Sequence, residues 1–173
     1  APGRAVSGCS GIWLTSRTGV TSRRRVSPRA GGSAAIGLGL PLVNGGQHVI
    51  RIEVWRERGH ELVLATATNE FLTHPIAKHL QIPNLLASPA EKIDGRYTGH
   101  PAGPACFRAE KLRYATDWLG RGRLEWGQVT SWFYSDSIHD LPLLEAVQNA
   151  VAVAPAEDPL AIAAASGWEI LAT

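Results

Sequence analysis

The sequence predicts an α/β protein built on a mostly parallel, Rossmann-like sheet. The stretch "ELVLAT" is continuously apolar, which is typical of a parallel strand buried on both faces of its sheet. From about residue 50 onward, strand-like and helix-like segments alternate, and this order implies right-handed β-α-β crossovers. With 173 residues, the chain has room for one domain with a sizeable core.

The first elements of this domain can be assigned in order. "IRIEVWRERG" predicts a helix that ends at Gly59, and "ELVLAT" follows as a strand. "EFLTHPIAKHL" predicts a helix with Pro75 near its first turn, where proline is tolerated. "IPNLLAS" is a second short strand, and "KIDGRYTGH" predicts a hairpin around Asp94 and Gly95.

The second half of the domain continues the alternation. "RAEKLRYATDWLG" predicts an amphipathic helix that ends at Gly120, followed by the strand "VTSWFYSD". "DLPLLEAVQ" then reads as a helix, "AVAVA" as a strand, "DPLAIAAASG" as a helix and "WEILAT" as a last strand. The elements therefore match an open α/β sheet.

Residues 1 to 48 differ from this pattern. Residues 1 to 50 hold six arginines and ten of the eighteen glycines, but no Asp, Glu or Lys. Three interpretations of this segment are a twin-arginine export signal, an organellar transit peptide and a nucleic-acid-binding arm. The favoured hypothesis is that residues 1–48 are foreign to the domain, either frameshifted or disordered, and that residues 49–173 form the core.

Bulk properties narrow the class of protein. The net charge of +2 by itself implies neither a nucleic acid nor a membrane as partner. Cys9 and Cys106 lie far apart, which suggests no disulfide framework or zinc site and predicts a reducing cytoplasm. No run approaches the roughly 20 apolar residues of a membrane-spanning helix.

Candidate site residues lie at the carboxyl ends of the predicted strands, where open α/β sheets bind their ligands. Three places qualify: residues 66–69, the neighbourhood of Ser88, and residues 135–140. In the third, Asp136 and Asp140 form a hard-oxygen pair suited to Mg²⁺, which in turn suggests a phosphate ligand.

Each candidate also has a simpler interpretation. Asp140 could serve only as the N-cap of the next helix, and Asp136 could be a solvated turn residue. The Thr66 hydroxyl could bond to nearby backbone, and Lys111 could be an ordinary surface lysine.

Taken together, these residues resemble the haloacid dehalogenase (HAD) superfamily. The likeness lies in a hydroxyl residue that ends one strand, a lysine early in a helix, and an S-D-x-x-x-D loop after a later strand. The phrases "RGHELVLATATNEFLTHPIA", "DGRYTG" and "YSDSIHDLPLLEAV" resemble the phosphoserine-phosphatase-like subfamily IB. The resemblance covers residues 50–173 and implies a Rossmann-like, three-layer HAD fold.

The resemblance also implies a role for each residue. Thr66 and the backbone N–H of Ala67 would bind the transferred phosphoryl group, and Lys111 would counter its charge. Asp136 would bind Mg²⁺, and Asp140 would support the metal shell and orient the lysine. The implied reaction is hydrolysis of a small phosphorylated metabolite, such as phosphoserine or histidinol phosphate, by a cytoplasmic enzyme.

The sequence departs from the family in one decisive respect. The first HAD motif, D-x-D-x-T/V, supplies the nucleophile, yet the first aspartate of this chain is Asp94. Glu53, Glu57 and Glu61 lie on or beside a predicted helix and cannot replace it. The first strand and the cap are therefore expected to be absent or replaced, and the phosphatase inactive or impaired.

Two other functions stay open. One is a pseudoenzyme that keeps the phosphate pocket for binding, and the other, disfavoured, is an arginine-rich nucleic-acid binder. In the family, the missing strand lies between strands 62–66 and 130–134. A gap there would leave unpaired backbone groups, so "GIWLTS" or "AAIGLGLPLV" is expected to fill it.

Overall fold

The computed structural model describes residues 10–17, 52, 55–153 and 157–171. Its strands are β1 (Ser10–Arg17), β2 (Glu61–Asn69), β3 (Asn84–Ser88), β4 (Ala90–Ile93), β5 (Arg96–Pro101), β6 (Val129–Ser135), β7 (Asn149–Val153) and β8 (Glu169–Leu171). Its labelled helices are α2 (Glu70–His79), α3 (Ala109–Arg121), α4 (Leu141–Ala146) and α5 (Glu157–Ala165), with short 3-10 turns at Trp126–Gln128 and Ile138–Asp140. Residues 52 and 55–57 are also helical.

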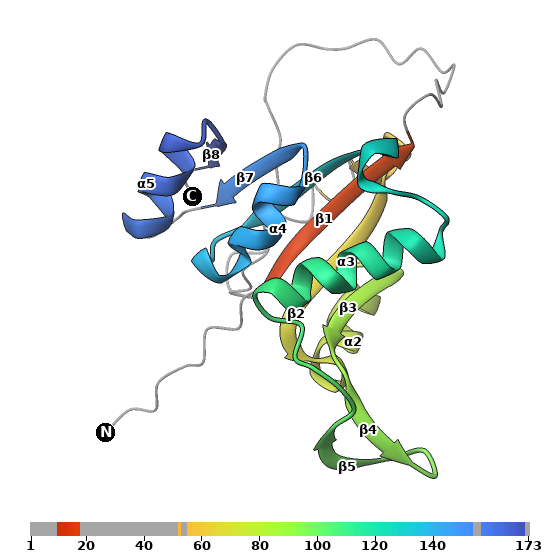
Figure 1. Ribbon diagram of the computed structural model, residues 1–173. Coiled ribbons are helices and arrows are strands. Elements are labelled where there is room, and N and C mark those ends of the chain that lie inside the picture. Colours follow the sequence, from red (N-terminus) through yellow and green to blue (C-terminus); the bar gives the residue numbers. More distant parts are fainter. Residues whose placement is uncertain (1–9, 18–51, 53–54, 154–156, 172–173) are drawn as a thin grey trace.

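Six of these strands form one sheet in the order β3-β2-β1-β6-β7-β8 (Figure 1). β2 pairs in parallel with β3, β6 with β7, and β7 with β8. The mostly parallel sheet that the sequence predicts is therefore present. β4 and β5 form a separate two-stranded hairpin at the end of β3.

β1 occupies the position between β2 and β6, as expected for the segment "GIWLTS". It runs antiparallel to both neighbours, so that Ser10 lies opposite Thr66, and Arg17 lies opposite Val129. Its hydrogen bonds satisfy the inner edges of β2 and β6, which would otherwise be unpaired in the middle of the sheet. The amino end of β1 therefore lies beside the carboxyl ends of its neighbours.

The two faces of the sheet bury separate apolar clusters. Alternate residues of β2 point to opposite sides: Leu62 and Leu64 pack with Ala77 of α2, whereas Val63 and Ala65 pack with α3 and α4. Helices thus cover both faces, which gives the three layers visible in Figure 1. This burial on both faces explains why the stretch "ELVLAT" is continuously apolar.

Details of three elements differ from the sequence prediction or sharpen it. α3 continues through Gly120 and ends at Arg121, and Pro75 lies inside α2 rather than in its first turn. The hairpin turn does fall at Asp94 and Gly95, whose φ angles of 51° and 77° match the type I′ geometry of tight hairpins.

Two further points bear on the sequence analysis. No helix in the described ranges is long and apolar enough to cross a membrane. The boundary near residue 48 stays a prediction, and residues 18–48, including the alternative segment "AAIGLGLPLV", lie outside the described residues.

Candidate active site

The candidate residues converge on one edge of the sheet. Thr66 lies near the carboxyl end of β2, and Ser135 ends β6 on the other side of β1. Helix α3 begins at Ala109 and carries Lys111 in its first turn. Because β2 and β6 run in the same direction, their carboxyl ends lie at the same edge, and the loop that follows β6 joins them there.

Lys111 and Asp140 form a buried ion pair at this edge. The lysine Nζ lies 2.5 Å from Asp140 Oδ1, and both side chains are 0% exposed. The other carboxylate oxygen, Oδ2, accepts a hydrogen bond of 2.7 Å from Ser135 Oγ. Burying either charge alone would cost several kcal/mol, so each residue requires the other.

This pair overturns two of the simpler interpretations. Lys111 is not a surface lysine, because it is fully buried. Asp140 precedes α4 as its N-cap residue, but its side chain makes no capping hydrogen bond and turns to Lys111 and Ser135 instead. The carboxylate therefore holds the lysine rather than the helix end.

Asp136 sits in the same loop in a less buried environment. Burial raises the pKa of its carboxyl group, and the neighbouring Asp140 charge raises it further, while a backbone hydrogen bond and Lys111 oppose the shift. The backbone N–H of Ser137 donates to Ser135 Oγ at 3.1 Å, which fixes the turn that carries Asp136. Asp136 thus lies within electrostatic range of the ion pair.

Thr66 is fully buried, and its hydroxyl makes the local bond that the simpler interpretation predicts. Its Oγ1 accepts the backbone N–H of Thr68 at 3.1 Å. A hydroxyl can accept and donate at the same time, so this bond is compatible with binding a phosphate oxygen. Asn69 closes the segment by accepting the N–H of Phe71 as the N-cap of α2.

Two other residues near the ion pair, Glu110 and His139, contact neighbouring side chains. The Glu110 carboxylate, which stands beside Lys111, accepts a hydrogen bond of 2.7 Å from Arg113 Nε and is half-exposed on α3. The His139 ring packs against Phe107, with ring centroids 5.0 Å apart. Phe107 thus connects the segment before α3 to the aspartate loop.

Cys106 is a site neighbour that the sequence analysis does not single out. It is fully buried, and burial raises the pKa of its thiol to about 11, although Lys111 acts in the opposite direction. A buried thiol with such a pKa is protonated at neutral pH and is a poor nucleophile. Its proximity to Lys111 in sequence, five positions away, is the only signal that could have placed it here.

Magnesium binding by Asp136 and Asp140 stays a prediction. In the described part of the chain, no group of three or more His, Cys, Asp or Glu side chains is placed to hold a metal ion. Both oxygens of Asp140 are engaged by Lys111 and Ser135, so Asp136 is left as one hard-oxygen ligand. Magnesium usually keeps several waters and is bound through one or two carboxylates together with phosphate oxygens, so the Asp136 carboxylate is compatible with a site that a phosphate ligand completes.

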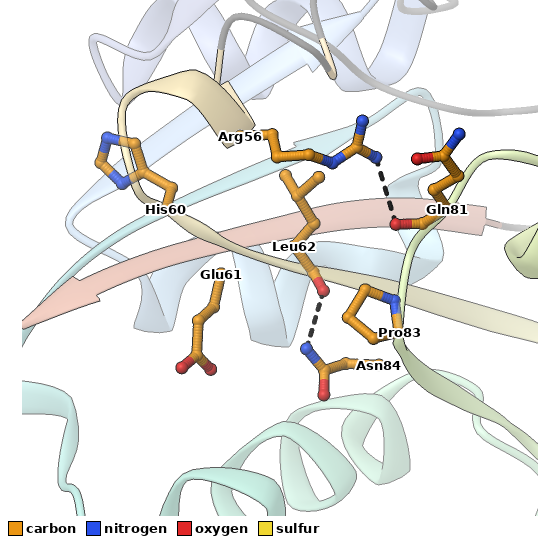
Figure 2. Close-up of a pocket in the computed structure, with 7 residues that line it drawn as sticks. All are labelled: Arg56, His60, Glu61, Leu62, Gln81, Pro83 and Asn84. Atoms are coloured by element: carbon orange, nitrogen blue, oxygen red, sulfur yellow. Dashed lines mark hydrogen bonds between the residues drawn. The ribbon is translucent and has the colours of Figure 1, made fainter.

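A hollow of about 590 Å³ lies at the opposite edge of the sheet, where β2 and β3 begin (Figure 2). It is lined by Arg56, His60, Glu61, Leu62, Gln81, Pro83 and Asn84. The Arg56 guanidinium donates to the carbonyls of Leu80 and Gln81 at 2.9 and 3.1 Å. Its cation is thus engaged by the end of α2, and the hollow contains none of the candidate residues.

Comparison with known proteins decides the family. The family model of haloacid dehalogenase-like hydrolases matches residues 45–145, which is more than half of the chain. The chain belongs to this family. This HAD membership accounts for the Rossmann-like sheet and for the strand-end positions of Thr66 and the aspartate loop.

Relatives of this HAD chain include named phosphatases. It is 36% identical over 115 residues to a histidinol-phosphatase of Neisseria meningitidis, covering 65% of this chain and 52% of that protein. It is 33% identical over 114 residues to phosphoserine phosphatase SerB1 of Mycobacterium tuberculosis, covering 66% and 36% of the two chains. The chain therefore spans about half or less of the length of these curated relatives.

A solved structure supports the same assignment. The crystal structure of a protein of unknown function from Bordetella pertussis Tohama I superposes with a TM-score of 0.67 and 38% identity. The match covers 72% of this chain and 56% of the other. The HAD fold of the described residues is thus shared with an experimentally determined relative.

Proposed function

We propose that this chain carries the phosphate-binding, charge-neutralising part of a HAD phosphomonoesterase site, and that by itself it is inactive or strongly impaired as a hydrolase. The observation that carries the proposal is the buried Lys111–Asp140 ion pair, which lies at the same carboxyl edge of the sheet as Thr66. The substrate class is a small phosphorylated metabolite, as the names of the histidinol-phosphatase and phosphoserine phosphatase relatives suggest.

The ion pair fixes the position of the Lys111 ammonium group. Phosphoryl transfer depends mostly on positioning and on stabilising charge at the equatorial oxygens of the phosphoryl group. Asp140 holds Lys111 through one oxygen and is itself held by Ser135 through the other, so the ammonium position is set before a ligand arrives. Such preorganisation favours a role in binding an anion over a purely structural role.

Thr66 and the backbone N–H of Ala67 complete the proposed phosphate contacts. Both lie toward the carboxyl end of β2, where Thr66 lies opposite Ser10 of β1 and the pairing with β3 shifts its register between Ala65 and Asn69. The hydroxyl and the amide would donate hydrogen bonds to phosphate oxygens, while Lys111 balances their charge.

A nucleophile is the missing part of this proposal. No residue before Asp94 in the sequence is an aspartate, and Asp140 is committed to Lys111 and Ser135. Cys106 is buried and its thiol is protonated at neutral pH. Covalent phosphoryl transfer needs a positioned nucleophile, so binding without efficient turnover is expected.

We expect this chain to bind magnesium only weakly. HAD phosphatases as a family generally use Mg²⁺. Here Asp136 is the residue that would contact it, and we expect loose binding in the absence of a phosphate ligand, because the carboxylate then supplies the only charged contact among the described residues. The chemistry that Mg²⁺ supplies in such sites is neutralisation of phosphate charge.

A pseudoenzyme that binds phosphorylated metabolites without hydrolysing them rests on the same residues and is the second candidate. Measurable turnover of a phosphomonoester distinguishes an impaired enzyme from such a pseudoenzyme.

A nucleic acid is disfavoured as partner because the net charge is only +2 and the six arginines of residues 1–50 form no recognised module. Cytoplasmic residence also stays a proposal.

The test is a titration of the full chain with inorganic phosphate, monitored by ¹⁵N NMR and by calorimetry. Thr66→Val removes the hydroxyl at nearly constant volume and is expected to weaken binding by about tenfold, the equivalent of roughly one charge-assisted hydrogen bond. Lys92→Ala is the matched control, because this exposed hairpin lysine lies on β4, outside the site.

Loss of phosphate binding in Thr66→Val but not in Lys92→Ala would support the proposal. Phosphate binding that neither change affects would place the anion elsewhere and overturn it. Wild-type protein that shifts no amide at the carboxyl ends of β2 and β6 under saturating phosphate would have the same consequence.

A further inference from the structure

We propose that Ser88 and Cys106 are positioning residues that form a polar clamp between the phosphate-binding end of β2 and the segment that leads to Lys111. The inference rests on the proposed function, because it assigns these residues to the phosphate site. Neither residue is among the predicted contacts of the phosphate or the metal. Ser88 marked one of the three strand ends in the sequence, but no role followed from its type alone.

Ser88 joins two segments through a single oxygen. Its hydroxyl donates to the backbone carbonyl of Ala67 at 2.7 Å. The same oxygen accepts the backbone N–H of Cys106 at 3.0 Å. Ser88 ends β3, Ala67 lies near the end of β2, and Cys106 lies three residues before α3. One side chain thus ties two neighbouring strand ends to the approach of the lysine helix.

This bond fixes the orientation of one peptide group in the candidate phosphate loop. The Ala67 carbonyl and the Thr68 N–H belong to the same planar peptide unit. Ser88 Oγ holds its carbonyl end, and Thr66 Oγ1 holds its N–H end at 3.1 Å. A peptide plane held at both ends cannot rotate, so the backbone around Ala67 is set before phosphate binds.

Cys106 provides a second, buried connection between the segment before α3 and the sheet. Its thiol, fully buried, donates to the Leu86 carbonyl of β3 at 3.5 Å. The nearby Thr66 backbone counteracts part of the effect of burial on the thiol pKa. Cys106 is therefore linked to β3 through Leu86 and Ser88, and it lies close to Thr66 of β2.

The consequence is a fixed separation between Thr66 and Lys111. Lys111 follows Cys106 by five residues, and α3 begins between them at Ala109. The ion pair with Asp140 anchors the lysine from the β6 side, whereas the clamp anchors its segment from the β2 and β3 side. Loss of the clamp is therefore expected to weaken phosphate binding by about tenfold, which is the equivalent of roughly one hydrogen bond.

The residue type at position 88 follows from this geometry. The site requires one atom that donates to a carbonyl and accepts from an amide, which a hydroxyl can do. Ser88→Ala removes both bonds and leaves Ala67 O and Cys106 N–H without this partner. Ser88→Thr keeps the hydroxyl on a β-branched residue that suits the end of a strand.

The experiment compares inorganic phosphate binding of the full wild-type chain with Ser88→Ala and Ser88→Thr, by calorimetry and ¹⁵N NMR. We expect about tenfold weaker binding in Ser88→Ala and near wild-type affinity in Ser88→Thr. Amide hydrogen exchange at Cys106 is expected to accelerate in Ser88→Ala and to return toward the wild-type rate in Ser88→Thr. Thr98→Ala removes an exposed hairpin hydroxyl that bonds to Glu91 and serves as the matched control.

Thr66→Val separates the failure of the clamp from the failure of the proposed function. If Thr66→Val binds phosphate about tenfold more weakly than the wild-type chain, but Ser88→Ala binds it as tightly as wild type does, the clamp is overturned and the proposed site stands. Weakened binding in Ser88→Ala that Ser88→Thr fails to restore would also overturn it, since the hydroxyl would not be the cause. If wild-type chain binds no phosphate, both proposals fall.

Discussion

The two edges of the central sheet each hold a cation, yet they differ in what that cation can do. At the carboxyl edge, Lys111 is fully buried and paired with Asp140, which Ser135 holds in turn. At the amino edge, Arg56 borders a hollow of about 590 Å³ (Figure 2) but donates to the carbonyls of Leu80 and Gln81 at the end of α2. This hollow therefore lies away from the buried charges, which are at the edge where strand direction predicts a ligand.

The largest effect expected from this comparison concerns turnover. Loss of a nucleophile has cost on the order of 10⁶ in turnover in other enzymes, with the remainder due to binding and charge stabilisation. We expect the 173-residue chain to hydrolyse p-nitrophenyl phosphate with Mg²⁺ at a rate lower by about that factor than a complete relative. Steady-state assays measure this difference.

A graft provides the converse of that measurement. Replacing residues 1–48 with a D-x-D-bearing strand and cap from a relative is expected to restore turnover. Ordinary phosphatase rates in the unmodified chain, abolished by Asp136→Asn, would mean that a nucleophile exists which the described edge does not reveal.

The second effect concerns stability at the two edges. Lys111→Ala leaves the buried Asp140 carboxylate without its cation and is expected to lower the free energy of unfolding by about 3–5 kcal/mol. Arg56→Ala removes two hydrogen bonds that a partly exposed side chain donates to backbone carbonyls, and it is expected to lower the free energy of unfolding by about 1 kcal/mol. Urea denaturation measures both, and equal losses would contradict the contrast between the edges.

The third effect is a pH response of opposite sign at the two edges. Burial, assisted by Arg58, lowers the pKa of His60 near the hollow, so its contribution to stability is present above pH 6.5 and lost as the pH falls. The pKa of the Cys106 thiol is raised from 9.0 to about 11, so its contribution is present below pH 9 and lost as the pH rises toward 11.

Thermal melts of two variants isolate these contributions. His60→Gln is expected to flatten the acid side of the stability profile, and Cys106→Ala the alkaline side. The Trp55 and Trp132 rings pack against His60, so a general packing loss would lower stability at every pH instead. A uniform loss in both variants would show that titration at these edges does not govern stability.

The smallest effect concerns Mg²⁺. We expect weak binding at the loop after β6, detected as small ¹⁵N shifts around Asp136, and weaker binding still in Asp136→Asn. Glu91→Gln on the hairpin is a suitable control, because that carboxylate is engaged by Thr98 and lies outside the loop. Tight binding that Asp136→Asn leaves unchanged would place the metal elsewhere.

Much of the fold could be predicted from local sequence patterns. The apolar run of β2, the Asp94–Gly95 turn and the helix that carries Lys111 each follow from a pattern of neighbouring residues. Thr66 and the S-D-x-x-x-D loop were identifiable because strand ends collect polar residues in such sheets. The end of α3 was misplaced at Gly120, since a single glycine only weakly disfavours a helix that packing supports.

The environment of the site residues could not be predicted in the same way. Lys111 and Asp140 are separated by 29 positions, and Ser88 and Cys106 by 18. Periodicity reports which face a residue occupies but not which distant residue meets it. A lysine in a mixed helix looks like a surface residue until the loop after β6 is placed against it.

The α/β class, the family resemblance and the absence of an aspartate before Asp94 follow from the amino-acid sequence alone, because they depend on composition and local order. The antiparallel course of β1 between β2 and β6, the burial of Lys111 against Asp140 and the link from Ser88 to the segment before α3 are established by the three-dimensional structure. Each of these depends on pairing of buried polar groups across the sheet. Such groups must find partners in space, and their partners are distant along the chain.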